Sequence, residues 1–410
     1  MMNPTIQLEN QFNAHNYEPL PVVLTHGEGV YVWDDKGNQY IDMMSAYSAV
    51  SHGHCHPKLV QALTEQAQKL SLVSRAFYTN RLGEFLQKAC AATKQQRALP
   101  MNSGAEAVET AMKVARKWAY EVKKVKPDAA EIIACEGNFH GRTIAIIGLS
   151  SEPQYKKNFG PFPAGYKLIP YGDAESLRKA ITPNTAAFLV EPIQGEAGIV
   201  VPPEGYLKKC AEICRENNVL LIADEIQTGL GRTGKLLACE HENIQPDAVL
   251  LGKALGGGFL PVSLFLTRHE VMDILKPGDH GSTFGGNPLA AALGIAALDL
   301  LFEEKLIERS AEMGAYLRSA LSRLSSPIIA EVRGRGLLVG LVINPRYYSA
   351  REICLRLLEK GVLTKDTHDT VVRLAPPLII TREQIDQVVA AISNVLVEAE
   401  AACKQGFERE

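Results

Sequence analysis

Two short apolar runs, each with a charged residue closely behind it, limit the possible folds of this chain most strongly. Residues 220–223 and 248–251 are entirely apolar, and turn-forming residues follow both runs. Runs of this length are typical of strands that are buried on both faces of a parallel sheet. Ligands bind such sheets just beyond the carboxyl ends of the strands. We therefore expect Asp224 and Lys253, which follow the two runs, to lie at one site.

The residue types at these two positions favour one chemistry. Lys253 has apolar neighbours and is followed by three glycines at 256–258, and burial of a lysine lowers its pKa and favours a nucleophilic amine. A nearby aspartate could hold a protonated pyridine nitrogen, so the pair predicts pyridoxal 5'-phosphate (PLP) as cofactor. An exposed lysine and a helix-capping aspartate would explain the two positions equally well, so the rest of the chain must decide.

Residues 100–106, with the sequence PMNSGAE, predict a strand end that turns into a helix. Apolar residues at helical spacing follow, and Ser103 with Glu106 has the form of a capping box. Gly104 and Ala105 are small enough for backbone N–H groups at the helix start to approach a phosphate closely. An ordinary capped helix would have the same features.

Three further segments follow the predicted strands or lie in a turn downstream of them. In residues 137–143, Phe139 could stack on a flat cofactor and Arg142 could hold a carboxylate. Residues 191–196 follow another apolar run, and the turn at 280–288 offers two hydroxyls that suit a phosphate. Each segment is a weak signal alone, but together and in this order they favour a PLP site.

With these motifs the chain resembles the class III PLP-dependent aminotransferases of fold type I, and most closely the ornithine aminotransferases among them. The resemblance extends over residues 15–377. It implies that Lys253 carries the cofactor covalently and that Asp224 binds its pyridinium nitrogen. It also implies that Gln227 contacts the 3-oxygen of the ring and that Phe139 stacks on the ring face.

For the phosphate, the resemblance implies backbone N–H groups of Gly104 and Ala105 from one subunit. Ser282 and Thr283 would reach the same phosphate from the neighbouring subunit. The expected partner is therefore a second copy of the chain, in a homodimer with shared active sites.

For the substrates, the resemblance implies five side chains: Tyr17, Tyr47, Arg142, Glu196 and Arg373. Arg142 and Tyr17 would hold the α-carboxylate and α-amino group of ornithine, so that its δ-amine reaches the cofactor, and Tyr47 would shape the same pocket. Glu196 would mask Arg373 until 2-oxoglutarate arrives, and a buried arginine needs such a partner on energetic grounds as well. Ordinary packing of the tyrosines and a structural salt bridge are the alternatives.

The expected reaction is transfer of the δ-amino group of L-ornithine to 2-oxoglutarate. Its products would be glutamate 5-semialdehyde, which cyclises to pyrroline-5-carboxylate, and glutamate. The alternatives are another aminotransferase acting on acetylornithine, 4-aminobutyrate or lysine, a PLP-dependent mutase, and a non-catalytic protein that keeps the fold.

The order of predicted elements indicates an α/β fold with two domains. Residues 51–290 alternate between strands and helices, as expected for a large PLP-binding domain with a mostly parallel sheet. The N-terminal segment 1–50, with a hairpin formed by residues 29–34 and 39–42, and the C-terminal part 291–410 are expected to form one smaller, discontinuous α+β domain. Within it, residues 332–342 are expected to form a glycine-bent strand.

Composition excludes several other classes of protein. The net charge of −3 and the absence of a basic stripe argue against a nucleic-acid partner. No apolar stretch reaches the roughly 18 residues of a membrane-spanning helix. The first ten residues lack the marks of a targeting sequence, and the eight cysteines follow no disulfide spacing, so a cytoplasmic location is expected.

Residues 52–57, with the sequence HGHCHP, look like a metal site. Ligands this close in sequence rarely converge on one ion without help from a distant segment. The resemblance implies no metal here either, so none is expected.

Overall fold

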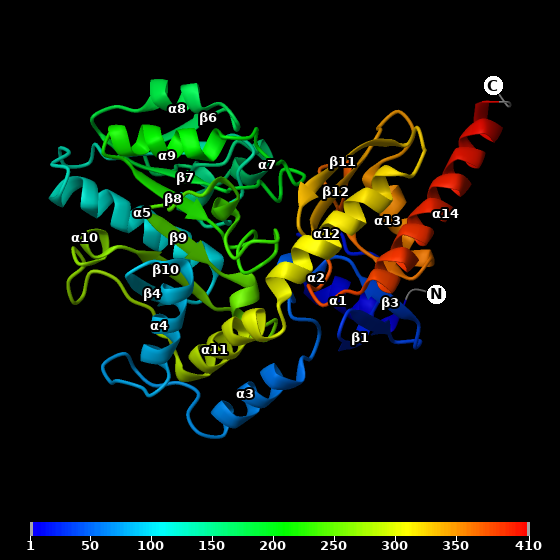
Figure 1. The fold of residues 1–410 in the computed structure, drawn as a ribbon, viewed down its shortest axis with the longest axis horizontal. Coiled ribbons are helices and arrows are strands. Elements are labelled where there is room, and N and C mark those ends of the chain that lie inside the picture. The colour runs from blue at the N-terminus through cyan, green and yellow to red at the C-terminus, as the bar shows by residue number, and fades with distance from the viewer. Residues whose placement is uncertain (1–2, 408–410) are drawn as a thin grey trace.

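A seven-stranded sheet forms the middle of the larger part of the molecule, on the left in Figure 1. The computed structural model describes residues 3–407, and within them this sheet has the strand order β4-β10-β9-β8-β7-β5-β6. Its strands are β4 (Arg97–Met101), β5 (Glu131–Cys135), β6 (Tyr166–Ile169), β7 (Thr185–Val190), β8 (Leu220–Asp224), β9 (Ala248–Leu251) and β10 (Ser263–Thr267). Only β10 runs antiparallel to its neighbours among these described strands. The predicted mostly parallel sheet is confirmed.

The two apolar runs that we expected to be buried strands are β8 and β9. All their residues are buried, and the strands are parallel neighbours with Asp224 opposite Leu250. Because the two parallel strands end at the same edge of the sheet, Asp224 and Lys253 emerge beside one another.

Helices on both faces explain why these strands are apolar throughout. In β7, Ala187 and Leu189 pack with helix α5 (Gly104–Glu121) on one face. Phe188 and Val190 pack with α9 (Tyr206–Glu216) on the other. Alternate side chains of one strand therefore enter two separate cores.

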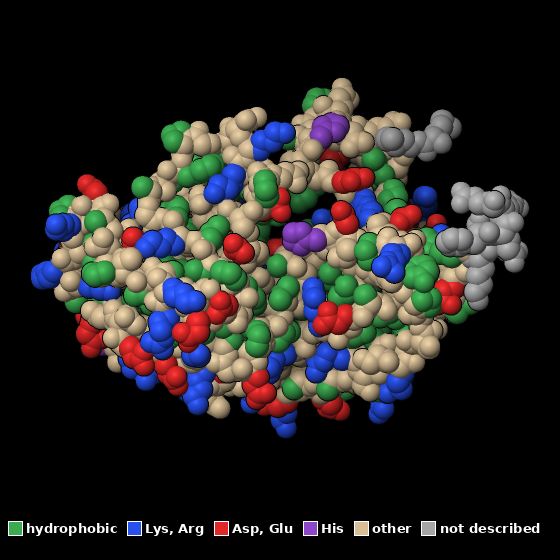
Figure 2. All heavy atoms as spheres, turned by 90° about the horizontal axis from the view of Figure 1, so that it is seen from above, with side chains coloured by type: hydrophobic (Ala, Val, Ile, Leu, Met, Phe, Trp, Pro, Cys, Tyr) green, Lys and Arg blue, Asp and Glu red, His purple; other side chains and the backbone are tan. Residues whose placement is uncertain are grey.

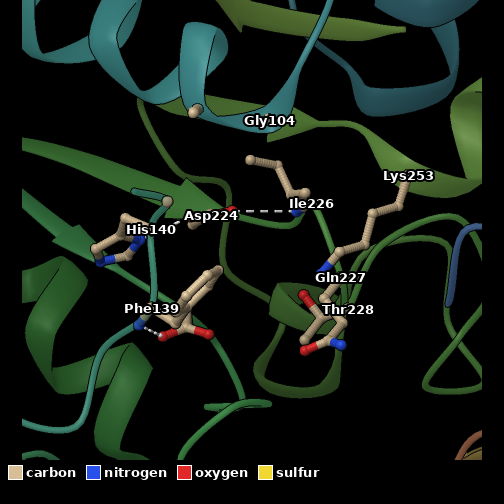
Figure 3. A pocket seen from close by; sticks show the side chains of 11 residues that line it. Gly104, Phe139, His140, Asp224, Ile226, Gln227, Thr228 and Lys253 are labelled. Carbon is tan, nitrogen blue, oxygen red and sulfur yellow. Dashed lines mark hydrogen bonds and ion pairs between the residues drawn. The ribbon is translucent and has the colours of Figure 1, made fainter. Parts of the chain in front are cut away.

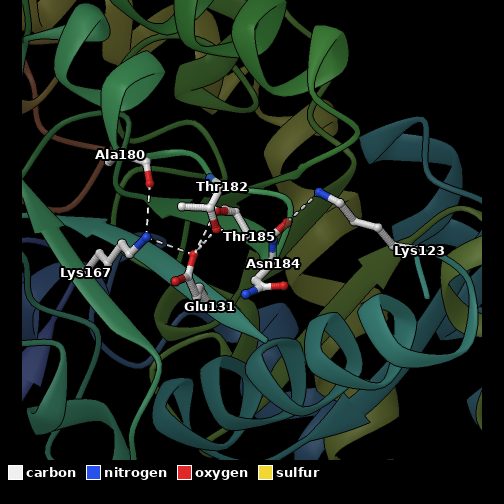
Figure 4. A network of polar contacts seen from close by, with 7 residues as sticks. All are labelled: Lys123, Glu131, Lys167, Ala180, Thr182, Asn184 and Thr185. Carbon is white, nitrogen blue, oxygen red and sulfur yellow. Dashed lines mark hydrogen bonds and ion pairs between the residues drawn. The ribbon is translucent and has the colours of Figure 1, made fainter. Parts of the chain in front are cut away.

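A polar network surrounds Glu131 at the start of β5, at the amino ends of the parallel strands (Figure 4). Its Oε2 accepts hydrogen bonds from the Lys167 ammonium and from the hydroxyls of Thr182 and Thr185. Lys123 donates to the carbonyl oxygen of Thr185. This network ties together three strands and the loops before them, far from the edge that carries Asp224.

The remaining helices of the larger part surround the sheet and extend below it in Figure 1. They are α3 (Pro57–Ala67), α4 (Leu82–Thr93), α6 (Ile144–Gly148), α7 (Pro153–Lys156), α8 (Ala174–Ala180), α10 (His269–Met272), α11 (Pro288–Glu303) and the 3-10 turns η1 (Ala238–Glu242) and η2 (Lys253–Gly256). α11 is almost wholly apolar because it is buried between α3, α4 and η2.

The smaller part of the molecule, on the right in Figure 1, joins the two ends of the chain. Its C-terminal elements are the strands β11 (Ile329–Arg335), β12 (Leu338–Ile343), β14 (Lys365–Thr367) and β15 (Val371–Leu374), with α12 (Leu306–Ser322), α13 (Ala350–Glu359) and α14 (Arg382–Phe407). Its N-terminal elements are α1 (Pro4–Phe12), β1 (Leu24–Glu28), β2 (Tyr31–Asp34), β3 (Gln39–Asp42) and α2 (Ser45–Ser48). β3 pairs in parallel with β13 (Val362–Leu363). This pairing supports the discontinuous smaller domain, whose division at residues 50 and 290 stays a prediction.

The hairpin expected from residues 29–34 and 39–42 is present as β2 and β3, but the expected single strand over 332–342 is wrong. The chain reverses at Gly336 and forms two antiparallel strands, β11 and β12. Gly336 has a φ of +52°, and a Cβ there would lie 2.3 Å from the carbonyl carbon of Thr233. Glycine is therefore required for the reversal, because the loop after β8 packs directly against it.

The surface carries both signs of charge. On the face shown in Figure 2, basic and acidic side chains are interspersed, and the surface is hollowed near the middle of the view. Within residues 3–407, no helix is both long and apolar enough to cross a membrane. The histidines of the 52–57 turn bond to separate partners: His52 to the Ala297 carbonyl, His54 to Asp42 and His56 to Glu304.

Candidate active site

A cavity of about 200 Å³ lies at the sheet edge where Asp224 and Lys253 emerge (Figure 3). It is lined by Gly104, Ala105, Phe139, His140, Gly141, Glu191, Asp224, Ile226, Gln227, Thr228 and Lys253. Six of these were expected at one site from the sequence. Figure 3 shows the Lys253 side chain extending toward Gln227, with Asp224 on the far side of the cavity.

The start of helix α5 forms one wall of this first cavity. Ser103 accepts a hydrogen bond from the Glu106 N–H, and the Glu106 carboxylate accepts one from the Ser103 N–H, so the predicted capping box is confirmed. The cap fixes the first turn with Gly104 and Ala105 at the cavity wall. The positive end of an 18-residue helix therefore points at the cavity, as anion binding requires.

Lys253 begins the 3-10 turn η2 with a φ of +45°, a conformation that non-glycine residues rarely adopt. Burial lowers the pKa of its ammonium group, and the charge of Glu196 only partly offsets this effect. A lysine in this state loses its proton more readily than an exposed one, which suits a nucleophile or a proton carrier.

Asp224 is backed by a residue that the sequence analysis did not single out. Its Oδ2 lies 2.7 Å from Nδ1 of His140, and both side chains are buried. Burial alone would lower the pKa of His140, but the hydrogen bond to Asp224 and its charge outweigh burial and raise it. The histidine therefore holds the Asp224 carboxylate in place.

Glu191 is a second buried acid that the sequence analysis treated only as part of a segment. Burial and the charge of Asp224 raise its pKa to about 7, against the opposing effect of His140. Its carboxylate accepts a hydrogen bond of 2.9 Å from the Phe139 N–H and so holds the backbone of the aromatic residue. The 191–196 turn also passes close to Gln227, because a Cβ on Gly195 would lie 1.6 Å from the Gln227 Oε1.

A second cavity, of about 1010 Å³, shares Lys253 and Phe139 with the first. All five side chains expected to bind substrates line it: Tyr17, Tyr47, Arg142, Glu196 and Arg373. Segments more than 350 residues apart in the chain therefore meet within reach of Lys253.

Glu196 and Arg373 form a bidentate ion pair in this second cavity. The two nitrogen–oxygen distances are 2.8 and 2.9 Å, and Arg373 is only 1% exposed. Burial would raise the pKa of Glu196, but the charge of Arg373 and the hydrogen bonds to it hold the pKa at about 2. The Tyr47 ring lies 5.3 Å from the Arg373 guanidinium and covers it. The expected pair is present, and protonation near neutral pH does not open it.

Arg142 is held in a different way, by aromatic rings. Its guanidinium carbon lies 3.6 Å from the ring centre of Tyr155 and 5.5 Å from that of Phe139. Tyr155 was not foreseen, because only the folded chain brings α7 against residue 142. Arg142 forms no ion pair among the described residues, so its charge stays available to a carboxylate. Tyr17 lies at the rim and is 70% exposed.

Ser282 and Thr283 line neither of these two cavities. Ser282 accepts hydrogen bonds from the Asn102 side chain and the Gly285 N–H, and Thr283 is exposed. The expected contact of these residues with the phosphate of a neighbouring subunit's cofactor stays a prediction.

Comparison with known proteins agrees with this geometry. Residues 12–396 match the family model described as "Aminotransferase class-III". The chain belongs to the class III aminotransferases. The ornithine aminotransferase of Bacillus subtilis is 57% identical over 394 residues, which cover 96% of this chain and 98% of that protein. The one from Brevibacillus brevis is 55% identical with the same coverage.

Solved structures of class III aminotransferases have the same fold. The ornithine aminotransferase of Toxoplasma gondii superimposes with a TM-score of 0.96 at 46% identity, over 98% of this chain and 95% of that one, and its structure holds PLP at partial occupancy. An acetylornithine aminotransferase from Elizabethkingia anophelis gives a TM-score of 0.88 at 51% identity, over 96% and 98% of the two chains.

As a class III aminotransferase, this chain uses PLP, and the lining of the first cavity fits that cofactor. A helix N-terminus suits the phosphate, an aromatic ring suits a flat ring system, and a lysine suits an aldehyde. The buried Asp224, paired with His140, suits a protonated ring nitrogen.

Proposed function

We propose that this chain is an ornithine δ-aminotransferase. It transfers the δ-amino group of L-ornithine to 2-oxoglutarate and gives glutamate 5-semialdehyde, which cyclises to pyrroline-5-carboxylate, and glutamate. The observation that carries the proposal is a single cavity next to Lys253 that holds two arginines. Arg373 is masked by Glu196, and Arg142 is not. The full-length likeness to ornithine aminotransferases supports it.

The residues around the first cavity would hold the cofactor as follows. Lys253 binds it covalently, Asp224 binds the ring nitrogen, and Gln227 contacts the 3-oxygen. Phe139 stacks on the ring, while the backbone N–H groups of Gly104 and Ala105 bind the phosphate. When bound, PLP accepts the electrons released at the substrate carbon and stores the amino group between the two half-reactions.

Lys253 then serves as the proton carrier. Lys253 lines both cavities, so its free amine would face a cofactor in the first and a substrate in the second. The lowered pKa of the amine lets it take a proton from the carbon that carries the reacting amino group and return a proton elsewhere. Donor and acceptor use the same cavity in turn, so ping-pong kinetics are expected.

Charge placement determines which amine of ornithine reacts. Arg142 and Tyr17 bind the α-carboxylate and α-amino group far from Lys253, and Tyr47 shapes the cavity around the extended chain. Arg373 would attract the same carboxylate to a position that places the α-amine at the cofactor, but Glu196 occupies it. 2-Oxoglutarate has two carboxylates, so it can engage both arginines once the pair opens.

The first experiment tests the donor. With 2-oxoglutarate as acceptor, ornithine, acetylornithine, 4-aminobutyrate and lysine are each offered to the purified holoenzyme, and products are identified by mass spectrometry. Ornithine is expected to give the highest kcat/KM and pyrroline-5-carboxylate as product. Acetylornithine is the second candidate, because an acetylornithine aminotransferase is 51% identical to this chain. A higher kcat/KM with acetylornithine would overturn the proposal.

We also propose that the active site is shared within a homodimer, with Ser282 and Thr283 reaching the phosphate of the partner's cofactor. A Lys253→Ala chain and a Thr283→Arg chain are each expected to be inactive alone. When the two variants are mixed under conditions that exchange subunits, they form heterodimers. One site of each heterodimer then carries both substitutions, and the other site carries neither. About a quarter of wild-type activity is then expected for random pairing of two-fold symmetric dimers.

The matched control for this mixing experiment is the double variant, Lys253→Ala with Thr283→Arg, mixed with the wild type. A shared site predicts that these heterodimers are inactive, because each site receives one lesion. A site within one chain predicts the reverse: no recovery in the first mixture and an active wild-type site in the second.

The reaction is proposed to take place in the cytoplasm. The eight cysteines lie within residues 3–407 and form no disulfide there. Most are buried among apolar side chains, as structural thiols in a reducing compartment are.

A further inference from the structure

Arg232 is a buried arginine that the proposed mechanism does not use. It lies in the loop after β8 and is 0% exposed, yet no carboxylate among the described residues forms an ion pair with it. Burial lowers its pKa to about 9, with only a distant effect of Asp42 in the other direction. Burying a charge without a counter-charge costs stability, and hydrogen bonds to the guanidinium offset part of that cost.

The guanidinium of Arg232 bonds to C-terminal residues through one terminal nitrogen and to N-terminal residues through the other. Nη1 donates to the carbonyl oxygens of Leu337 and Pro376, at 3.0 and 2.6 Å. Nη2 donates to the hydroxyls of Ser45 and Ser51, at 3.3 and 2.8 Å. The planar fork therefore fixes the separation of the C-terminal segment on one side and the N-terminal turn on the other.

The N-terminal turn is one that needs external support. Ser45, Ala46, Tyr47 and Ser48 have φ values of +43°, +46°, +59° and +76°, and non-glycine residues avoid this region. Consecutive residues in this conformation persist only where the surroundings hold them. Ser51, which Arg232 binds, donates in turn to the Ser48 carbonyl and so holds the end of the turn.

Both segments carry substrate-cavity residues near the bonded atoms. Tyr47 is the third residue of the strained turn, and Arg373 precedes Pro376 by three positions at the end of β15. A direct bond from the Ser45 hydroxyl to the Ala375 carbonyl, at 2.6 Å, joins the same two segments beside Arg232. Arg232 thus bonds to the two segments that bring the Tyr47 ring and Arg373 into contact.

We propose that Arg232 is a positioning residue that sets substrate affinity: it holds the strained Ser45–Ser48 turn against the end of β15 and so keeps Tyr47 over Arg373. Arg232 itself lines neither cavity. The proposal rests on the function proposed above, since it assigns how the site for the carboxylate substrate is built.

Two variants test this role. Arg232→Lys keeps the charge but has one nitrogen, which cannot bond to both segments in the same geometry. Ser51→Ala removes one acceptor and its bond to Ser48 with little change in volume. In the holoenzyme, KM for 2-oxoglutarate and the Kd of the unreactive dicarboxylate glutarate are expected to rise by about tenfold, the loss expected for one hydrogen bond to a charged group. Cofactor affinity, followed by absorbance, is expected to stay within about twofold, since neither Arg232 nor Ser51 lines the first cavity.

Arg309→Lys is the matched control. Arg309 also bonds to carbonyl oxygens of the C-terminal segment, those of Ile379 and Ile380, but it does not reach the Ser45–Ser48 turn. It is expected to lower Tm while KM and the glutarate Kd stay unchanged. The same result for Arg232→Lys and Ser51→Ala, a lower Tm with unchanged glutarate affinity, would overturn the proposal. If Arg232→Lys does not fold, the folded Ser51→Ala protein decides the question.

The glutarate measurement separates this inference from the proposed function. If glutarate affinity falls in Ser51→Ala but the wild type does not use ornithine, the positioning role stands and the donor assignment fails. If the wild type uses ornithine and glutarate affinity is unchanged in Ser51→Ala, the positioning role fails alone.

Discussion

Lys253→Ala is expected to lower turnover with ornithine and 2-oxoglutarate by at least about 10³-fold, because it removes the covalent anchor and the proton carrier together. Lys253 lines both cavities, and the pKa of its amine is lowered. Stopped-flow absorbance of the cofactor with each substrate measures the loss in each half-reaction separately.

Borohydride reduction of the wild-type holoenzyme, followed by peptide mapping, identifies the anchoring residue directly. The pyridoxyl group is expected on Lys253, and Lys276→Ala, which changes an exposed lysine far from both cavities, is expected to label identically. A label on another lysine, or none, would contradict the assignment.

Glu196→Ala is expected to change which amine of ornithine reacts. In the structure the carboxylate occupies Arg373 through two hydrogen bonds, and its loss leaves that guanidinium open to the ornithine α-carboxylate. The ratio of δ- to α-transamination should fall roughly 5- to 150-fold. This change corresponds to about 1–3 kcal/mol, the range for losing a specific charged contact. Cofactor binding and the half-reaction with glutamate should remain largely intact. Single-turnover assays that separate the two products measure the ratio.

Two further variants make this test specific. Glu196→Gln keeps the shape of the side chain and removes its charge, so it is expected to shift the ratio in the same direction. Glu152→Gln removes a charge from the same cavity without touching Arg373, so it should leave the ratio unchanged. Unchanged regiochemistry in Glu196→Ala, with both half-reactions slowed equally, would show that Glu196 does not control access to Arg373.

The opening of the Glu196–Arg373 pair has a direct physical cause in this account. Because Arg373 holds the pKa of Glu196 at about 2, the carboxylate stays ionised at neutral pH and protonation does not release it. The competitor must be another carboxylate, and 2-oxoglutarate carries one at each end. In the proposed function, the two arginines would therefore favour a dicarboxylate as the acceptor.

The parts of the fold and site that the sequence predicted are those with a local signal. The strands β8 and β9 are continuous apolar runs because helices cover both faces of the sheet, and such runs are visible in the sequence. Asp224 and Lys253 follow from them, since parallel strands end at one edge. The capping box at Ser103 is likewise a pattern of neighbouring residues.

The parts that the sequence did not predict depend on segments that meet only in the folded chain. His140 and Glu191 become a buried pair of supports because the chain segments after β5 and β7 converge on Asp224. Nothing near position 232 indicates that its arginine binds hydroxyls 181 and 187 positions away. The single strand expected over 332–342 was wrong because its glycines, which we expected only to bend one strand, include Gly336, where the chain reverses.

The most direct test of the central claim is a single turnover with ornithine that carries ¹⁵N only in its δ-amino group. The wild-type holoenzyme is mixed with this donor and then with 2-oxoglutarate, and both products are analysed by mass spectrometry. The label is expected in glutamate, and the carbon product is expected to be pyrroline-5-carboxylate without ¹⁵N. Unlabelled glutamate, with ¹⁵N retained in an α-keto acid, would contradict it.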